Sequence, residues 1–197
     1  MKKETKKKLI ISLSVIIPLI LIITFTLVYN LNPSFQIFIS GKDVIRHSYE
    51  EFEGGSNEIF ISEKDGQLYF DVYKRSRSTV FNGFLGNIGE SEGIPQKLLE
   101  SFALEGYSPE GSAMVFVFDQ QVLDGRIDSK FKTLFIQKAP ENAKEDTKKF
   151  NNYNVTSEII EHKGNRYQLV TAHRIINHDM NNFGIEEMLE FISEINN

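Results

Sequence analysis

Hydrophobic positions along the chain form one long unbroken block, followed by several short segments with alternating or helical spacing. The block runs from Leu9 to Tyr29, 21 residues without Asp, Glu, Lys, Arg, Asn or Gln. A helix of that length measures roughly 31 Å, close to the thickness of a bilayer's hydrocarbon core. The pattern therefore predicts a transmembrane helix over residues 9–29, with Tyr29 at the membrane interface.

Two other interpretations of the block compete with a permanent anchor. A cleaved signal peptide has an apolar core of about 7–15 residues and a small-residue cleavage site. This block is longer, and no alanine precedes Ala103. A buried helix of a soluble domain rarely needs so long an apolar run. Both contrasts favour an uncleaved anchor.

The charges that flank the block predict its orientation. No basic residue follows it until Lys42, whereas five lysines precede it: Lys2, Lys3, Lys6, Lys7 and Lys8. Cytoplasmic flanks carry such an excess of positive charge. We therefore expect a single-pass protein of the cell membrane with a cytoplasmic basic tip (residues 1–8), a membrane span (9–29) and an extracellular domain (30–197).

The first part of the outer chain reads as a helix, a hairpin and a second helix. Ser40 to Asp43 resembles a capping box, which predicts an amphipathic helix over residues 40–53 that Gly54 ends. Strands at 58–62 and 67–74 flank a turn at Asp65-Gly66. A glycine-rich loop is expected at 79–93, and a helix between Pro95 and Gly106.

The second part predicts two further strand pairs and a closing helix. Strands are expected at 112–119 and 130–137, and a hairpin at 155–161 and 166–176, with a mobile polar insert at 139–153. An amphipathic helix begins near Gly184. The order α-ββ-α-ββ-ββ-α predicts an α+β domain with one mostly antiparallel sheet of about six strands and packed helices.

Composition narrows the cellular setting. The chain has no cysteine, which excludes disulfides and a lipidated N-terminal cysteine, and together with its content of Lys, Ile and Asn this favours a Gram-positive bacterium. The residues after the block include 17 basic and 26 acidic ones, a net charge of −9. Such a surface disfavours nucleic acid and favours a basic protein partner, although acidity also simply keeps a domain soluble.

No catalytic motif can be recognised. His47, His162, His173 and His178 do not have metal-site spacing, and no cysteine could complete a zinc site. His173 shares a strand face with Tyr167 and Leu169, which is typical of a core or half-buried histidine. Acidic pairs are too numerous for the sequence to select a catalytic one. We therefore predict no enzyme, no catalytic, cofactor-binding or metal-ligating residues, and no cofactor.

Two acidic segments are the candidate partner-binding residues. They comprise Glu50, Glu51 and Glu53 in the first segment and Glu90 and Glu92 in the glycine-rich loop. Carboxylates on the surface would complement a cationic protein that arrives from outside the cell.

The layout of the chain resembles the TipC family of membrane-anchored immunity proteins, which accompany type VII secretion in Gram-positive bacteria. The resemblance lies in the lysine tip, the span at 9–29, the absence of a lipidation cysteine and the single outer domain, and the run from Gly106 to Asp119 is compatible with it. It implies an immunity protein that directly binds and inhibits a secreted toxin, a lipid II-directed phosphatase.

The sequence is also compatible with two other functions. One alternative is an envelope ligand-binding or sensory accessory domain that holds a lipid or a cell-wall fragment. Another is an envelope hydrolase without a familiar motif.

Overall fold

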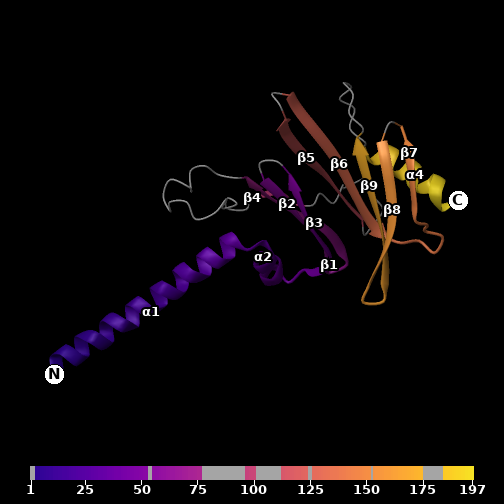
Figure 1. The fold of residues 1–197 in the computed structure, drawn as a ribbon. Helices are drawn as coiled ribbons and strands as arrows, with labels where there is room; N and C mark the ends of the chain where they lie inside the picture. The colour runs from indigo at the N-terminus through magenta and orange to yellow at the C-terminus, as the bar shows by residue number, and fades with distance from the viewer. Residues whose placement is uncertain are drawn as a thin grey trace. The chain divides into compact units, whose positions relative to one another are not determined.

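A computed structural model describes residues 3–52, 55–76, 96–100, 112–123, 126–151, 153–174 and 184–197. The chain divides into two compact units, residues 1–40 and 41–197. The first holds the helices α1 and α2, and the second holds all described strands and α4 (Figure 1).

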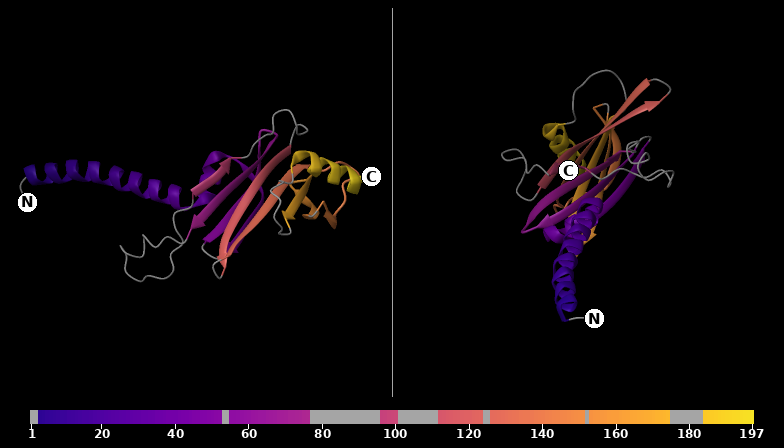
Figure 2. Two further views of the ribbon diagram at one scale, coloured as in Figure 1. Left: turned by 90° about the horizontal axis from the view of Figure 1, so that it is seen from above. Right: turned by 90° about the vertical axis from the view of Figure 1, so that its left-hand side faces the viewer.

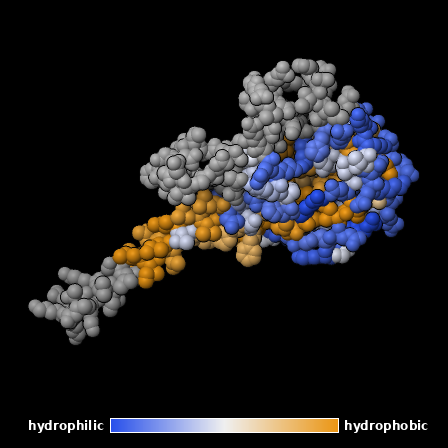
Figure 3. Space-filling model, in the orientation of Figure 1, coloured by the Kyte–Doolittle hydropathy of each residue, from blue (hydrophilic) through white to orange (hydrophobic). Residues whose placement is uncertain are grey.

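Unit 1 contains the predicted apolar helix, which runs further than expected. Helix α1 spans Lys3–Leu31 and accommodates Pro18 in its interior. Its window Ser14–Leu31 has a mean hydropathy of 2.2, and none of that window is buried. Figure 3 shows this hydrophobic surface along the helix. The helix is thus long and apolar enough to cross a membrane.

A second, short helix follows α1 directly. Helix α2 spans Pro33–Ser40. The Asn32 side chain accepts a hydrogen bond of 3.0 Å from the backbone N–H of Phe35, which is the bond an N-cap residue makes. Pro33 occupies the first helical position, where its missing N–H has no cost. The sequence analysis did not predict this helix.

Unit 2 contains two antiparallel sheets where one was predicted. In the described chain the first sheet has the strand order β1-β2-β3-β4, and the second has the order β5-β6-β9-β8-β7. The strands of the first sheet are β1 (Asp43–Phe52), β2 (Gly55–Lys64), β3 (Gln67–Ser76) and β4 (Gln96–Glu100). Those of the second are β5 (Ser112–Leu123), β6 (Arg126–Lys138), β7 (Asp146–Phe150), β8 (Tyr153–His162) and β9 (Asn165–Arg174).

Side chains from alternate positions of the second sheet build a core on each of its faces. One core lies between the two sheets and includes Ile59, Phe70, Val115 and Ile136. The other lies between the second sheet and α4 (Ile185–Asn196), and its buried members include Phe135, Val170 and Phe191. The second unit therefore has three layers, sheet, sheet and helix (Figure 2).

The two predicted hairpins and the closing helix are confirmed. Strands β2 and β3 join through Asp65 (φ 54°) and Gly66 (φ 81°), and β8 and β9 join through Lys163 (φ 51°) and Gly164 (φ 80°). Two successive positive φ values are typical of the two-residue turns that match strand twist. The apolar stripe of α4 is buried as its spacing predicted.

Two predicted helices are wrong. Residues 43–52 form strand β1, because their backbone pairs with β2 in antiparallel register, from Asp43 opposite Glu63 to Phe52 opposite Gly55. Residues 96–100 form strand β4, which pairs with β3. The predicted loop at 79–93 lies outside the described residues.

The polar segment at 139–153, predicted to be a mobile insert, instead contains strand β7 and a loop that is hydrogen-bonded to the end of α4. The Nδ2 of Asn142 donates to the backbone carbonyl of Asn196 at 2.7 Å, and the backbone N–H of Lys144 donates to the Asn196 side chain at 3.1 Å. The buried Gln168 binds that same side chain. Contacts with the end of α4, more than 50 residues away, therefore fix this loop.

Candidate functional site

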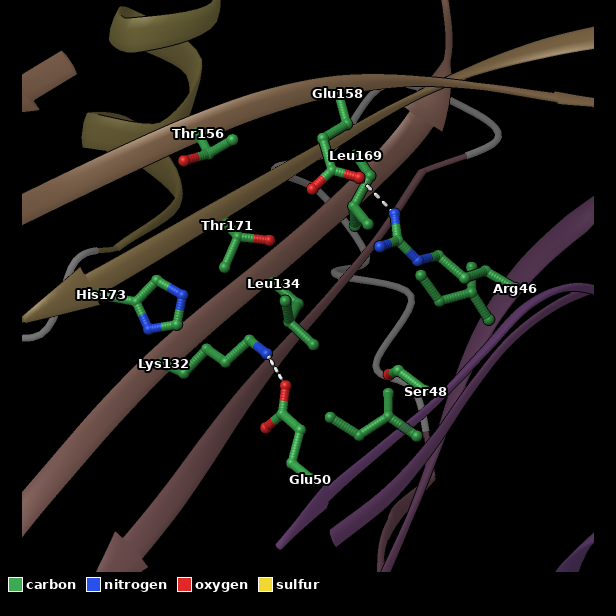
Figure 4. A pocket seen from close by; sticks show the side chains of 12 residues that line it. Arg46, Ser48, Glu50, Lys132, Leu134, Thr156, Glu158, Leu169, Thr171 and His173 are labelled. Carbon is green, nitrogen blue, oxygen red and sulfur yellow. Dashed lines mark hydrogen bonds and ion pairs between the residues drawn. The ribbon is translucent and has the colours of Figure 1, made fainter. Parts of the chain in front are cut away.

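A cleft of about 170 Å³ lies between the two sheets of unit 2. Strands β1 and β2 form one side, and β6, β8 and β9 form the other (Figure 4). The residues that line it are Arg46, Ser48, Glu50, Ile59, Ile61, Lys132, Leu134, Thr156, Glu158, Leu169, Thr171 and His173.

Strand geometry explains why these side chains meet. Arg46, Ser48 and Glu50 alternate along β1, so all three point to one face of the first sheet. In the second sheet, Lys132 pairs with His173 and Leu134 with Thr171, which sets their side chains on one common face. The two faces look toward each other across the cleft.

The floor of the cleft is aliphatic and continuous with the core between the sheets. Ile59, Ile61, Leu134 and Leu169 are buried members of that core. Hydroxyl and charged side chains stand around this floor. The cleft can therefore hold a group with a small apolar part and polar edges.

Two ion pairs cross the cleft from one sheet to the other. Arg46 on β1 donates a hydrogen bond to Glu158 on β8, and Lys132 on β6 donates one to Glu50 on β1 (Figure 4). Arg46 and Glu158 are 40% and 43% exposed, whereas Lys132 is 15% exposed. Water screens the first pair more strongly, so the second contributes more to holding the sheets together.

A third bridge joins the start of β1 to the β8–β9 turn. Lys163 Nζ lies 2.7 Å from one carboxylate oxygen of Asp43, and His162 Nε2 lies 3.0 Å from the other. Two hydrogen bonds lower the pKa of the Asp43 carboxyl below its usual value: the one from Lys163 has the larger effect, and the one from His162 adds to it.

A fourth bridge joins the end of β2 to β9. The buried Tyr167 hydroxyl donates a hydrogen bond to the Glu63 carboxylate. Burial, together with that nearby negative charge, raises the pKa of Tyr167 to about 12. The tyrosine therefore stays protonated and remains a donor over the whole physiological range.

The described histidines are spread over the domain. His47 lies on β1, where its ring stacks on Phe60 at 4.3 Å and its Nε2 is 3.0 Å from Glu58. His162 belongs to the third bridge. His173 shares a strand face with Tyr167 and Leu169 as predicted, but it is exposed at the cleft and not half-buried. His178 lies outside the described residues.

Two of the predicted partner-binding glutamates, Glu50 and Glu51, lie among the described residues, and these two do not share a face. Glu50 and Glu51 are neighbours on a strand and so point to opposite faces of β1. Glu50 lines the cleft in an ion pair with Lys132, while Glu51 is exposed. Glu53, Glu90 and Glu92 lie outside the described residues.

Sequence reasoning missed most of the residues that surround the cleft. Arg46 and Glu158 are 112 positions apart, and Glu50 and Lys132 are 82 apart. Residues 46–51 are polar on both faces of the strand, so they show no alternation that would have identified β1 as a strand. Among the residues described, no three His, Asp or Glu side chains gather as a metal ion would require.

Comparisons with known proteins give no relative. No family model, no curated protein and no solved structure matches the chain.

Proposed function

We propose that the chain is a membrane-anchored, non-enzymatic protein whose unit 2 lies outside the cell and binds a protein partner there. The observation that carries the proposal is the exposed apolar surface of α1, of which none is buried over Ser14–Leu31. Both hydrophobic cores consist of residues beyond position 44. The apolar surface of α1 belongs to neither core and is therefore suited to contact with lipid.

The flanking charges give the proposed orientation. Five lysines precede the apolar block, and this excess of positive charge supports a cytoplasmic N-terminal tip. All described strands and both hydrophobic cores belong to unit 2, so we assign the activity to that unit. A tether at the membrane raises the effective concentration of this unit toward a partner that acts on the same membrane.

The specific form that we propose is an immunity protein of a Gram-positive bacterium. It would neutralise a secreted antibacterial toxin that attacks the cell envelope by binding it directly, as the resemblance in layout to the TipC family suggests. The net charge of −9 beyond the helix supports a cationic toxin as the partner.

The experiment that tests this function is a protection assay. The full chain is expressed in a sensitive Gram-positive strain, and the strain is challenged with a secreted protein encoded next to its gene. We expect survival with the full chain, and binding of the purified toxin to the full chain in lipid nanodiscs. Survival equal to that of the empty-vector strain, together with no binding in nanodiscs, would overturn the immunity proposal.

The cleft favours a second candidate function, binding of a lipid or cell-wall fragment by a sensory or accessory domain. Its aliphatic floor and charged rim suit a small amphiphilic group. At about 170 Å³, however, the cleft is smaller than the roughly 300–1,000 Å³ of most ligand pockets. The second candidate therefore has weaker support than the first. Mass spectrometry of the full chain purified from its own membrane would reveal such a ligand.

A further inference from the structure

We propose that an extended segment of a protein partner, polar and basic overall, pairs with the outer edge of β1 and so extends the first sheet over β8 and β7. This inference rests on the proposed function, because it requires a protein partner. It adds the surface used, the conformation of the bound segment and its chemistry.

Strand β1 is the edge of the first sheet, and among the described strands it pairs with β2 alone. An edge strand presents backbone N–H and C=O groups that can template a further strand. At ten residues β1 is longer than the usual five or six, and it contains no proline. None of its side chains at 43–51 is buried, whereas those at 55–62 on β2 all are.

The second sheet has a partly exposed region beside β1, which we call the polar shelf and which shares Thr156, Thr171 and His173 with the cleft. It consists of Thr147, Lys149, Asn154, Thr156, Thr171 and His173. The register sets them on one face, because Thr147 pairs with Thr156, Lys149 with Asn154 and Asn154 with His173. All six are exposed or half-buried. Elsewhere on the same face, side chains such as Val115 on β5 and Ile136 on β6 are apolar and buried under the first sheet.

The ion pair between Arg46 and Glu158 connects β1 directly to β8, and thus the outer edge of β1 to the polar shelf. Paired strands lie about 4.8 Å apart, and stacked sheets about 10 Å apart. A strand added beside β1 would therefore lie over β8 and then β7, the region that Figure 1 shows to the right of β1. The added strand would extend the layer of the first sheet over the polar shelf.

The lining of the shelf determines which strand can bind. Asn154 and Thr171 present an amide and a hydroxyl there, and Lys149 presents an ammonium group. An apolar strand would dehydrate these groups without offering them hydrogen-bond partners. The exposed Glu51 on β1 and the net charge of −9 of the residues beyond α1 favour a segment that is basic overall, while Lys149 requires a neutral or acidic residue at the position opposite it.

The test uses the full chain in lipid nanodiscs and a phage-displayed library of random 12-residue peptides, counter-selected on empty nanodiscs. Each selected peptide is synthesised unmodified, N-methylated at odd positions, and N-methylated at even positions. Only one edge of an added strand pairs with β1. We therefore expect one methylation pattern to weaken binding at least tenfold and the other less than threefold. Equal effects of both patterns, or a selection without such a peptide, overturn the proposal.

Matched charge reversals locate the binding surface. Glu51→Lys on β1 and Glu161→Lys on β8 change an exposed residue by the same charge. We expect the first to weaken peptide binding at least fivefold and the second less than twofold. Hydrogen exchange should slow in residues 43–52 when the peptide is bound. Equal effects of the two reversals, or unchanged exchange in β1, contradict pairing at this edge.

The outcome separates this inference from the proposed function. If the full chain protects cells but Glu51→Lys does not affect toxin binding, the proposed function stands and binding at the edge of β1 is ruled out. If peptides pair with β1 but the chain protects against no toxin, the β1 binding surface stands and the immunity function is ruled out.

Discussion

Single residues hold the two sheets of the outer unit together through polar bridges that lie far apart in sequence. Asp43, Arg46 and Glu50 on β1, with Glu63 on β2, each bind a partner on the second sheet. These bridges stand at the margin of an apolar core, where water screens them unequally. Their contributions should therefore differ in a way that burial predicts.

The Tyr167 bridge should give the folding free energy a dependence on alkaline pH. Between its ordinary value of 10.0 and its raised pKa of about 12, the unfolded chain has lost the phenolic proton and the folded chain has kept it. The free energy of unfolding must therefore fall as pH rises through this range. We expect the difference between wild type and Tyr167→Phe, measured by urea unfolding, to shrink from pH 9 to pH 12. A constant difference would contradict the raised pKa.

The two ion pairs across the cleft should differ in strength. Glu50→Gln leaves Lys132, 15% exposed, without its counter-charge, and we expect a loss of about 1–3 kcal/mol in the free energy of unfolding. Glu158→Gln acts on a pair with both members at least 40% exposed, and we expect a loss below about 1 kcal/mol. Urea titration of both variants measures this order. The reverse order would show that burial does not set the strength of these pairs.

Among the elements, α4 covers one face of the second sheet and closes the second core. Phe191→Ala removes a ring that is 0% exposed, which should cost about 3–5 kcal/mol through lost burial and the resulting cavity. Glu190→Ala alters an exposed neighbour on the same helix and should change stability by less than about 0.5 kcal/mol. Thermal unfolding of the two variants provides the comparison. Equal destabilisation would contradict the packing of α4.

Elements with local signals were predictable from the sequence. Asp65-Gly66 and Lys163-Gly164 encode their hairpins within a few residues, and the stripe of α4 follows helical spacing. Strand β1 lacked such a signal, since polar residues occupy both of its faces from Arg46 to Glu51. Its conformation depends on pairing with β2 and on bridges to the second sheet. The cleft depends on the same contacts, so it could not be predicted either.

The division into two sheets also escaped prediction for a physical reason. Alternation within a strand shows that one face is buried, but it does not show which strand lies beside it. Residues such as Met114 and Val115 both pack in cores, on opposite faces of one strand. Such a strand is compatible with a single covered sheet as well as with a sheet between two layers.

For the whole molecule, the central claim is that α1 tethers unit 2 outside the membrane. The absence of cysteine from the chain permits a direct measurement, since any introduced cysteine is the only thiol. Lys149→Cys places one on the exposed face of β7, and Thr5→Cys places one in the N-terminal tip. Both single-cysteine chains are expressed in a Gram-positive host and treated with a membrane-impermeant maleimide.

We predict that in intact cells the reagent labels the cysteine at position 149 and not the one at position 5, which reacts only after permeabilisation. The labelled chain should remain in the membrane fraction at its full mass. Labelling of position 5 in intact cells, protection of position 149, or release of a shortened chain into the medium would contradict the account.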